Sequence, residues 1–153
     1  MTTQSPQSPA YPLPDGRAIS TAAHEALNAH FAAVERLGRV MAVVTAAAVR
    51  DILTDNDHDA PFDAAHAELI EAADGSLHGT GRYWTADGTE TSFTAAVGEQ
   101  DAGMGVFGMN EWTPYLGYEN EKVWKPLVEE LPERGGQKVY RLDLAKAAAL
   151  PLD

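Results

Sequence analysis

Residues 64–97 read "AAHAELIEAADGSLHGTGRYWTADGTETSFTAAV" and contain the tripeptide Ala-Asp-Gly twice, at residues 73–75 and 86–88. Each copy suits a three-residue hairpin loop in which the glycine takes the left-handed conformation. Apolar and polar residues alternate on both sides of each turn, as they do in strands with one buried face. The segment therefore predicts an antiparallel β-meander, with strands at residues 64–72, 76–85 and 89–97.

The two turns also fix the register. Arg82 is predicted to lie opposite His66 on the first strand and opposite Ser92 on the third. Because side chains alternate between the faces of a sheet, this register sorts the residues into two sets. The apolar set is predicted to be buried, namely Ala65, Ala67, Leu69, Leu77, Gly79, Gly81, Tyr83, Phe93, Ala95 and Val97. The other set, called here the polar sheet face, is His66, Glu68, His78, Thr80, Arg82, Trp84, Glu90, Ser92 and Thr94.

The segment from residue 19 to residue 53 is predicted to form one long helix, whose phase continues through Gly38. Its apolar positions recur at helical spacing, at Ile19, Ala23, Leu27, Phe31, Val34, Leu37, Met41, Val44, Ala48 and Ile52. This face is expected to pack on the meander. The other face also becomes apolar after Gly38, so we expect the second half to be covered all round and the chain to self-associate through the long helix. The alternative is a strand at residues 39–44, since β-branched residues favour strands.

The rest of the chain completes an α+β fold. Residues 98–112, "GEQDAGMGVFGMNEW", are predicted to be a flexible loop, because their GxGxxG string lacks the context of a nucleotide-binding loop. A helix is predicted from Glu119 to Leu131, a fourth strand in "QKVYRLDL", and a last short helix capped by Asp143 and ending at Leu150. The predicted architecture is a long N-terminal helix packed on a meander of three to four antiparallel strands, with additional C-terminal helices.

Composition limits the class of protein. The 153 residues include 23 acidic and 11 basic side chains, for a net charge of −12, and no cysteine. Such a chain repels nucleic acid and anionic membranes, so we expect neither as a partner and expect a protein partner, in particular a basic one. Residues 1–16 show no signal-peptide pattern and are predicted to be a disordered, proline-rich tail before a single domain at 17–153. A cytoplasmic location is expected.

Residues 54–66, "TDNDHDAPFDAAH", resemble a calcium loop only in part. Acidic residues occupy its odd positions, but Ala60 stands where the loop needs glycine and His66 where it needs glutamate. A facial iron triad of His66, Glu68 and His78 is also excluded, because the register separates the two histidines by roughly 13 Å. We therefore expect no metal and no cofactor.

Two classes of function remain open. The first is an inhibitor or adaptor that binds a protein through an aromatic–acidic surface formed by Trp112, Tyr115, Tyr118, Glu111, Glu119 and Glu121. These aromatic residues are equally typical of a loop anchored to its own core. The second class is a small-molecule-binding protein or enzyme with a pocket at the polar sheet face, lined by His66, Glu68, Arg82, Trp84 and Ser92. An enzyme of this class would use His66 or His78 as its general base.

Overall fold

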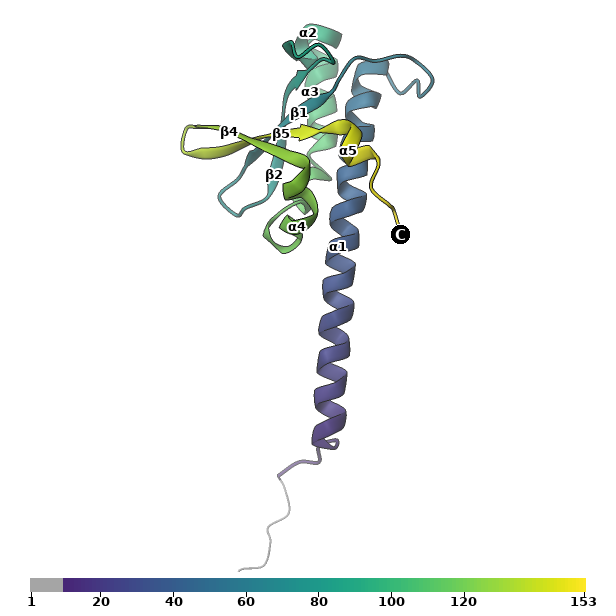
Figure 1. Ribbon diagram of the computed structural model, residues 1–153, viewed down its shortest axis with the longest axis vertical. Helices are drawn as coiled ribbons and strands as arrows, with labels where there is room; N and C mark the ends of the chain where they lie inside the picture. Colours follow the sequence, from purple (N-terminus) through teal and green to yellow (C-terminus); the bar gives the residue numbers. More distant parts are fainter. Residues whose placement is uncertain (1–9) are drawn as a thin grey trace, which may run out of the picture. The chain divides into compact units, whose positions relative to one another are not determined.

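The computed structural model describes residues 10–153 (Figure 1). Most of the predicted tail, residues 1–9, lies outside the described residues. Helix α1 (Gly16–Thr54) begins three residues earlier than predicted. It begins there because the Asp15 carboxylate accepts hydrogen bonds from the backbone N–H groups of Arg17 (3.2 Å) and Ala18 (3.3 Å).

The chain divides into two units, residues 1–32 and residues 33–153. In the first unit the helix buries none of the side chains that the structure describes. Ile19, Leu27 and Phe31, which the sequence pattern assigned to a packed face, are 44%, 51% and 57% exposed. This part of the predicted packing is therefore wrong.

The second unit is built on a five-stranded antiparallel sheet with the strand order β3-β2-β1-β5-β4. Its strands are β1 (His66–Glu71), β2 (Leu77–Trp84), β3 (Glu90–Ser92), β4 (Val128–Arg134) and β5 (Gln137–Asp143). The core joins one face of this sheet to the second half of α1, through Ala42, Ala46 and Val49. The predicted α+β class is confirmed. The alternative of a strand at residues 39–44 is wrong, because α1 is continuous there.

Both predicted turns are present, with left-handed glycines at Gly75 (φ +85°) and Gly88 (φ +88°). Near the first turn the register is the predicted one, with Glu71 opposite Leu77. Arg82 lies opposite Ser92, also as predicted. Between these points β2 contains a bulge that the sequence pattern did not predict, with Gly81 at φ +96°.

The bulge changes the pairing of β1 farther from the turn. Residues 80–82 of β2 lie across from the single residue Glu68, and His66 pairs with Trp84. The predicted pairing of His66 with Arg82 is therefore wrong. The buried face is nevertheless as predicted at Leu77, Tyr83 and Phe93.

The third strand is shorter than predicted, because β3 ends at Ser92 and helix α2 (Phe93–Val97) follows directly. The Ser92 hydroxyl accepts a hydrogen bond from the backbone N–H of Ala95 (3.1 Å) and caps this helix. The strand predicted over residues 93–97 is wrong, and Ala95 is exposed.

The glycine-rich segment is also helical, so the predicted flexible loop is wrong. Helix α3 (Glu99–Met109) lies beside the end of α1. Glycine normally weakens a helix by about 1 kcal/mol relative to alanine. At Gly105 its lack of a side chain is required for packing, because a Cβ atom there would lie 2.6 Å from Ile52 of α1.

The helix predicted from Glu119 to Leu131 is replaced by three short turns and a strand. The turns are η2 (Tyr118–Asn120), α4 (Glu121–Trp124) and η3 (Lys125–Leu127), and β4 begins at Val128. Pro126 lies in η3, where it cannot continue a helix from α4. The predicted strand β5 is confirmed, as is the role of Asp143, whose carboxylate caps α5 (Leu144–Ala148) by accepting from the Lys146 N–H (3.0 Å).

Candidate aromatic–acidic surface

The three aromatic side chains of the aromatic–acidic surface are exposed. Trp112 is 44% exposed, Tyr115 is 54% and Tyr118 is 64%. Trp112 precedes the turn η1 (Thr113–Tyr115), Tyr115 is its last residue, and Tyr118 begins η2, all between α3 and α4. This placement agrees with the prediction that they stay partly exposed.

The segment is anchored to the core by other side chains. Leu116 and Trp124 are buried, and the Trp124 indole N–H donates to the Gly117 carbonyl (2.8 Å). The Asn120 amide is also buried, and it donates to the Tyr115 carbonyl (2.9 Å) and accepts from the Gly117 N–H (3.0 Å). Because the anchors and the exposed aromatics are different residues, burial of the segment does not require Trp112, Tyr115 or Tyr118.

Asn110 fixes the start of this segment to the sheet. Its side-chain amide makes two hydrogen bonds to the backbone of Gly79 in β2, accepting at 2.8 Å and donating at 3.1 Å. The same oxygen accepts from the Thr113 hydroxyl (3.0 Å). A paired amide of this kind imitates a neighbouring strand, so the backbone that carries Trp112 is held in one position.

Tyr115 and Tyr118 border a hollow of about 260 Å³ that Val34 and Leu37 of α1 also line. The Tyr118 ring covers the first hairpin turn so closely that a Cβ atom on Gly75 would lie 2.2 Å from it. Tyr118 is thus held in place along one edge of its ring while most of the side chain remains exposed.

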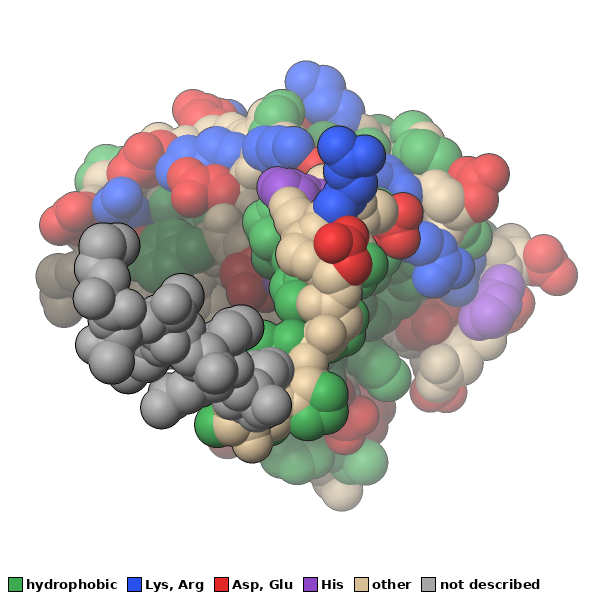
Figure 2. All heavy atoms as spheres, turned by 90° about the horizontal axis from the view of Figure 1, so that it is seen from below, with side chains coloured by type: hydrophobic (Ala, Val, Ile, Leu, Met, Phe, Trp, Pro, Cys, Tyr) green, Lys and Arg blue, Asp and Glu red, His purple; other side chains and the backbone are tan. Residues whose placement is uncertain are grey.

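The acidic residues of the surface differ in how far they are paired. Among the residues that the structure describes, Glu111 and Glu119 form no ion pair, whereas Glu121 lies 3.5 Å from the ammonium group of Lys125. Lys122 pairs with Glu35 of α1, and this hydrogen bond lowers the pKa of Glu35 below its usual value. In Figure 2, basic and acidic side chains are interspersed over the face in view. Within the aromatic–acidic surface, the unpaired carboxylates are therefore those of Glu111 and Glu119.

The polar sheet face is organised around Glu68, which is only 1% exposed. The guanidinium group of Arg134, at the end of β4, binds both carboxylate oxygens at 2.9 and 3.0 Å, and the Thr80 hydroxyl donates to one of them (2.9 Å). Burial acts to raise the pKa of Glu68, but these hydrogen bonds and the charges of Arg134 and Arg82 outweigh it, so the pKa is lowered. Glu68 is therefore an ionised, fully paired carboxylate.

The other residues predicted to line a ligand pocket on the polar sheet face either contact other side chains of the protein or lie apart from one another. Trp84 is buried, with the guanidinium group of Arg141 5.5 Å from its ring centre. Arg82 pairs with Glu90 (3.2 Å), and the cation that pairs with Glu68 is Arg134 (2.9 Å). The bulge carries Arg82 away from His66, and Ser92 is used to cap α2. These contacts leave few of the five side chains open to a ligand.

The acidic loop after α1 is exposed at residues 55–59. The Asp57 carboxylate accepts a hydrogen bond from the Asp59 N–H (3.1 Å) within the loop. The Asp51 carboxylate, near the end of α1, lies 3.3 Å from the His58 ring of the loop. Within residues 10–153 there is no cluster of three or more His, Asp or Glu side chains arranged to hold a metal ion.

Two further apolar side chains are exposed on α3, outside the residues predicted to form the aromatic–acidic surface. Met104 and Phe107 of α3 are 68% and 76% exposed, and they lie in the segment that was predicted to be a loop. Their helical spacing, three residues apart, was the available signal, but the three neighbouring glycines argued against a helix. With α3 formed, Met104 lines the same hollow as Trp112, and Phe107 is exposed elsewhere on the helix.

Comparison of the chain with protein-family models, with curated proteins and with solved structures finds no match. Among the helices that the structure describes, none combines the length and the apolar character needed to cross a bilayer.

Proposed function

We propose that this chain is a binding protein of the inhibitor or adaptor type, which engages a basic protein through the aromatic–acidic surface. The observation that carries the proposal is that, between residues 110 and 124, the side chains that anchor the segment and the aromatic side chains that are exposed are different residues. Leu116, Asn120 and Trp124 hold the segment to the core, while Trp112, Tyr115 and Tyr118 are exposed. Exposed aromatics on a rigid backbone offer large contact areas at a low cost in conformational entropy.

The charge distribution supports a basic partner. Glu111 and Glu119 lie beside the exposed rings and form no ion pair with a described residue. The whole chain carries a net charge of −12. Negative charge around an aromatic centre speeds the encounter with a basic protein and makes the rate of association fall with added salt.

Replacing Trp112 with alanine is expected to abolish capture of the native partner and to change the melting temperature by only about 1–2 °C. The small change follows because the side chain is 44% exposed and is not an anchor of the segment. The measurement is a pull-down from native lysate at low and high salt, beside thermal unfolding of the same preparations. The matched control is Phe62→Ala, since Phe62 is 45% exposed but lies in a different loop. A Trp112→Ala variant that keeps every captured protein, or that unfolds readily, would contradict the proposal.

We also propose that the chain self-associates through its long helix. The exposed apolar positions Ile19, Leu27 and Phe31 support this, because an amphipathic helix gains most of its stability by burying such a stripe. Light scattering is expected to show a mass above that of the monomer at micromolar concentrations, and Leu27→Glu is expected to restore the monomer. A wild-type protein that is monomeric throughout this range would refute self-association without affecting the proposed partner surface.

A further inference from the structure

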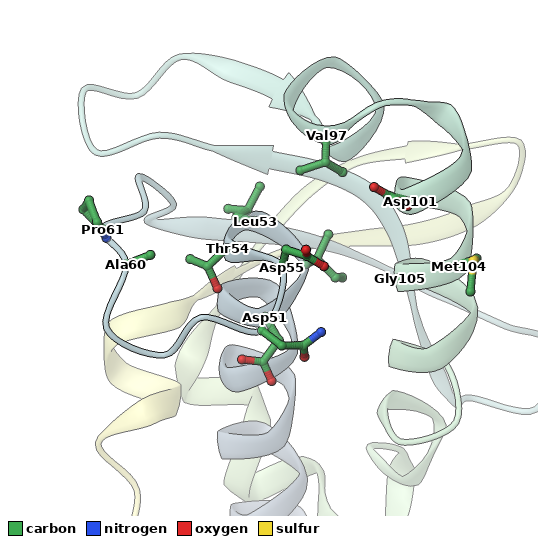
Figure 3. Close-up of a pocket in the computed structure, with 12 residues that line it drawn as sticks. Asp51, Leu53, Thr54, Asp55, Ala60, Pro61, Val97, Asp101, Met104 and Gly105 are labelled. Atoms are coloured by element: carbon green, nitrogen blue, oxygen red, sulfur yellow. The ribbon is translucent and has the colours of Figure 1, made fainter.

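A groove runs between the last turns of α1 and helix α3, and it ends at Trp112 in its more apolar part. It consists of two adjoining hollows of about 660 and 370 Å³ that share Asp51, Ile52, Asn56, Met104 and Gly105. Figure 3 shows the larger hollow, with Asp51 and Asp55 on the α1 side and Asp101 and Met104 on α3. The two helices run in opposite directions, because the C-terminal end of α1 meets the N-terminal end of α3.

Small and flexible side chains form the floor of the smaller hollow. Ala47 and Ala48 come from α1, Gly105 and Gly108 from α3, and Met104 and Trp112 stand beside them. The positions from Val44 to Thr54 that line the groove on α1 span about 15 Å at 1.5 Å per residue. That length accommodates about three turns of a further helix, and small residues let helix backbones approach closely.

The charges around the groove have one sign. Its lining includes Asp51, Asp55, Asp101 and Glu111 and no lysine or arginine. Arg50 lies outside the lining and pairs with Asp51 (3.0 Å). Asp55, Asp101 and Glu111 form no ion pair with any residue in the described part of the chain. A partner that lies in the groove therefore meets apolar surface at the floor and uncompensated carboxylates at both ends.

From this combination we infer that the groove binds an amphipathic helix of the partner protein, with its apolar face against Ala47, Ala48 and Gly108 and its basic residues at the acidic ends. This inference rests on the proposed function and adds the form and chemistry of the recognised segment. It makes Trp112 the point where the groove joins the aromatic–acidic surface. A groove that binds a helix recognises apolar side chains spaced three to four residues apart along the bound helix.

Two glycines of α3 give a matched pair of test variants. A Cβ atom at Gly108 or at Gly103 would meet nothing within 4 Å, so both positions have open space where a side chain leaves the backbone, and leucine is expected to be accommodated at each. Gly108 lines the groove, whereas Gly103 is exposed and lies outside its lining. Both Gly108→Leu and Gly103→Leu are expected to raise the melting temperature slightly, because leucine is a better helix former. Only Gly108→Leu fills the groove.

The probe is a synthetic 18-residue peptide, capped at both ends, with leucines at helical spacing and lysines elsewhere. Fluorescence anisotropy is expected to show that it binds the wild-type protein and Gly103→Leu equally, and Gly108→Leu at least about tenfold more weakly. Asp101→Asn is expected to weaken binding at low salt and to have less effect at high salt. A peptide of the same composition with scrambled leucine positions is expected to bind at least about tenfold more weakly than the patterned one.

Three outcomes would overturn the inference. The scrambled peptide could bind as well as the patterned one, which would show that only charge is recognised. Gly108→Leu could bind the patterned peptide as tightly as Gly103→Leu does. Alternatively, Gly108→Leu could convert an oligomer into a monomer while the wild-type protein ignores the peptide, which would assign the groove to a second copy. If Trp112→Ala loses the native partner in a pull-down but Gly108→Leu retains it, the groove inference fails while the proposed function stands.

Discussion

Replacing Phe93 with alanine is expected to lower the free energy of unfolding by about 3–5 kcal/mol, the range for truncating a fully buried aromatic ring. Phe93 is 1% exposed, and its ring stacks on Tyr83 with the ring centres 5.2 Å apart. It also covers the backbone at Gly81, where β2 bulges. Because Phe93 is the first residue of α2 and alanine is a good helix former, the loss measures packing rather than helix propensity.

Urea denaturation followed by circular dichroism measures this loss. The matched control is Phe107→Ala, since Phe107 is 76% exposed on α3 and its truncation is expected to change stability by no more than about 0.5 kcal/mol. Equal losses in the two variants would show that the apolar face of the meander is not the core.

The second large effect is expected when the buried carboxylate of Glu68 loses the guanidinium group of Arg134, with which it pairs. In Arg134→Met, Glu68 keeps the Thr80 hydroxyl but loses both hydrogen bonds from the guanidinium group. Leaving this buried carboxylate without its partner is expected to cost about 2–3 kcal/mol at neutral pH. The cost is below that of a fully buried pair because the Arg134 side chain is 48% exposed, so water reaches the site.

The pH dependence of this effect has a definite sign. In the wild-type protein the pKa of Glu68 is lowered, so the pair stabilises the fold above the ordinary carboxyl pKa and is lost as the pH falls through the lowered value. Burial is already the largest single influence on the pKa of Glu68, and in Arg134→Met the guanidinium group no longer opposes it. The pKa is therefore expected to rise, so that acidification removes an unfavourable charge. The difference in unfolding free energy between the two proteins should therefore be largest near neutral pH and shrink toward pH 4.

The control is Arg82→Met, which breaks an ion pair whose members are each about half exposed and which should change stability little. The double variant Arg134→Met/Glu68→Gln should recover part of the loss, because a neutral amide carries no buried charge. The assignment of Glu68 as an ionised structural carboxylate fails if Arg134→Met costs no more than Arg82→Met, or if its cost grows on acidification.

The elements predicted correctly from the sequence are those with strong local signals. Gly75 and Gly88 specified the two turns, and the alternation around them placed Leu77, Tyr83 and Phe93 on the buried face. The strand predicted over residues 93–97 is wrong because their alternation is also compatible with the helix α2, which the Ser92 hydroxyl caps by accepting from the Ala95 N–H. The bulge at Gly81 has no comparable pattern in the surrounding sequence from which it could be predicted.

The other misassignments depend on tertiary context. Helix α3 has a glycine at Gly105 because α1 passes close to it, and single-residue propensity counts this glycine only against a helix. Strand β4, "VEELPER", overlaps the helix predicted from Glu119 to Leu131, and its Pro132 and several acids are residues that interior strands avoid. The aromatic–acidic surface could be predicted because its residues adjoin in sequence. The groove could not, since it forms only when α3 lies against α1.

The position of β4 and β3 at the two edges of the sheet has a consequence for solubility. An outermost strand has backbone groups that a second chain can pair with, which is the usual route to edge-to-edge aggregation. Here β3 is three residues long and runs directly into α2, and β4 carries Glu129, Glu130, Pro132 and Glu133. Strand addition is therefore disfavoured at both edges, even at high concentration. The associations proposed above are therefore expected to use side-chain surfaces, where single substitutions can control them.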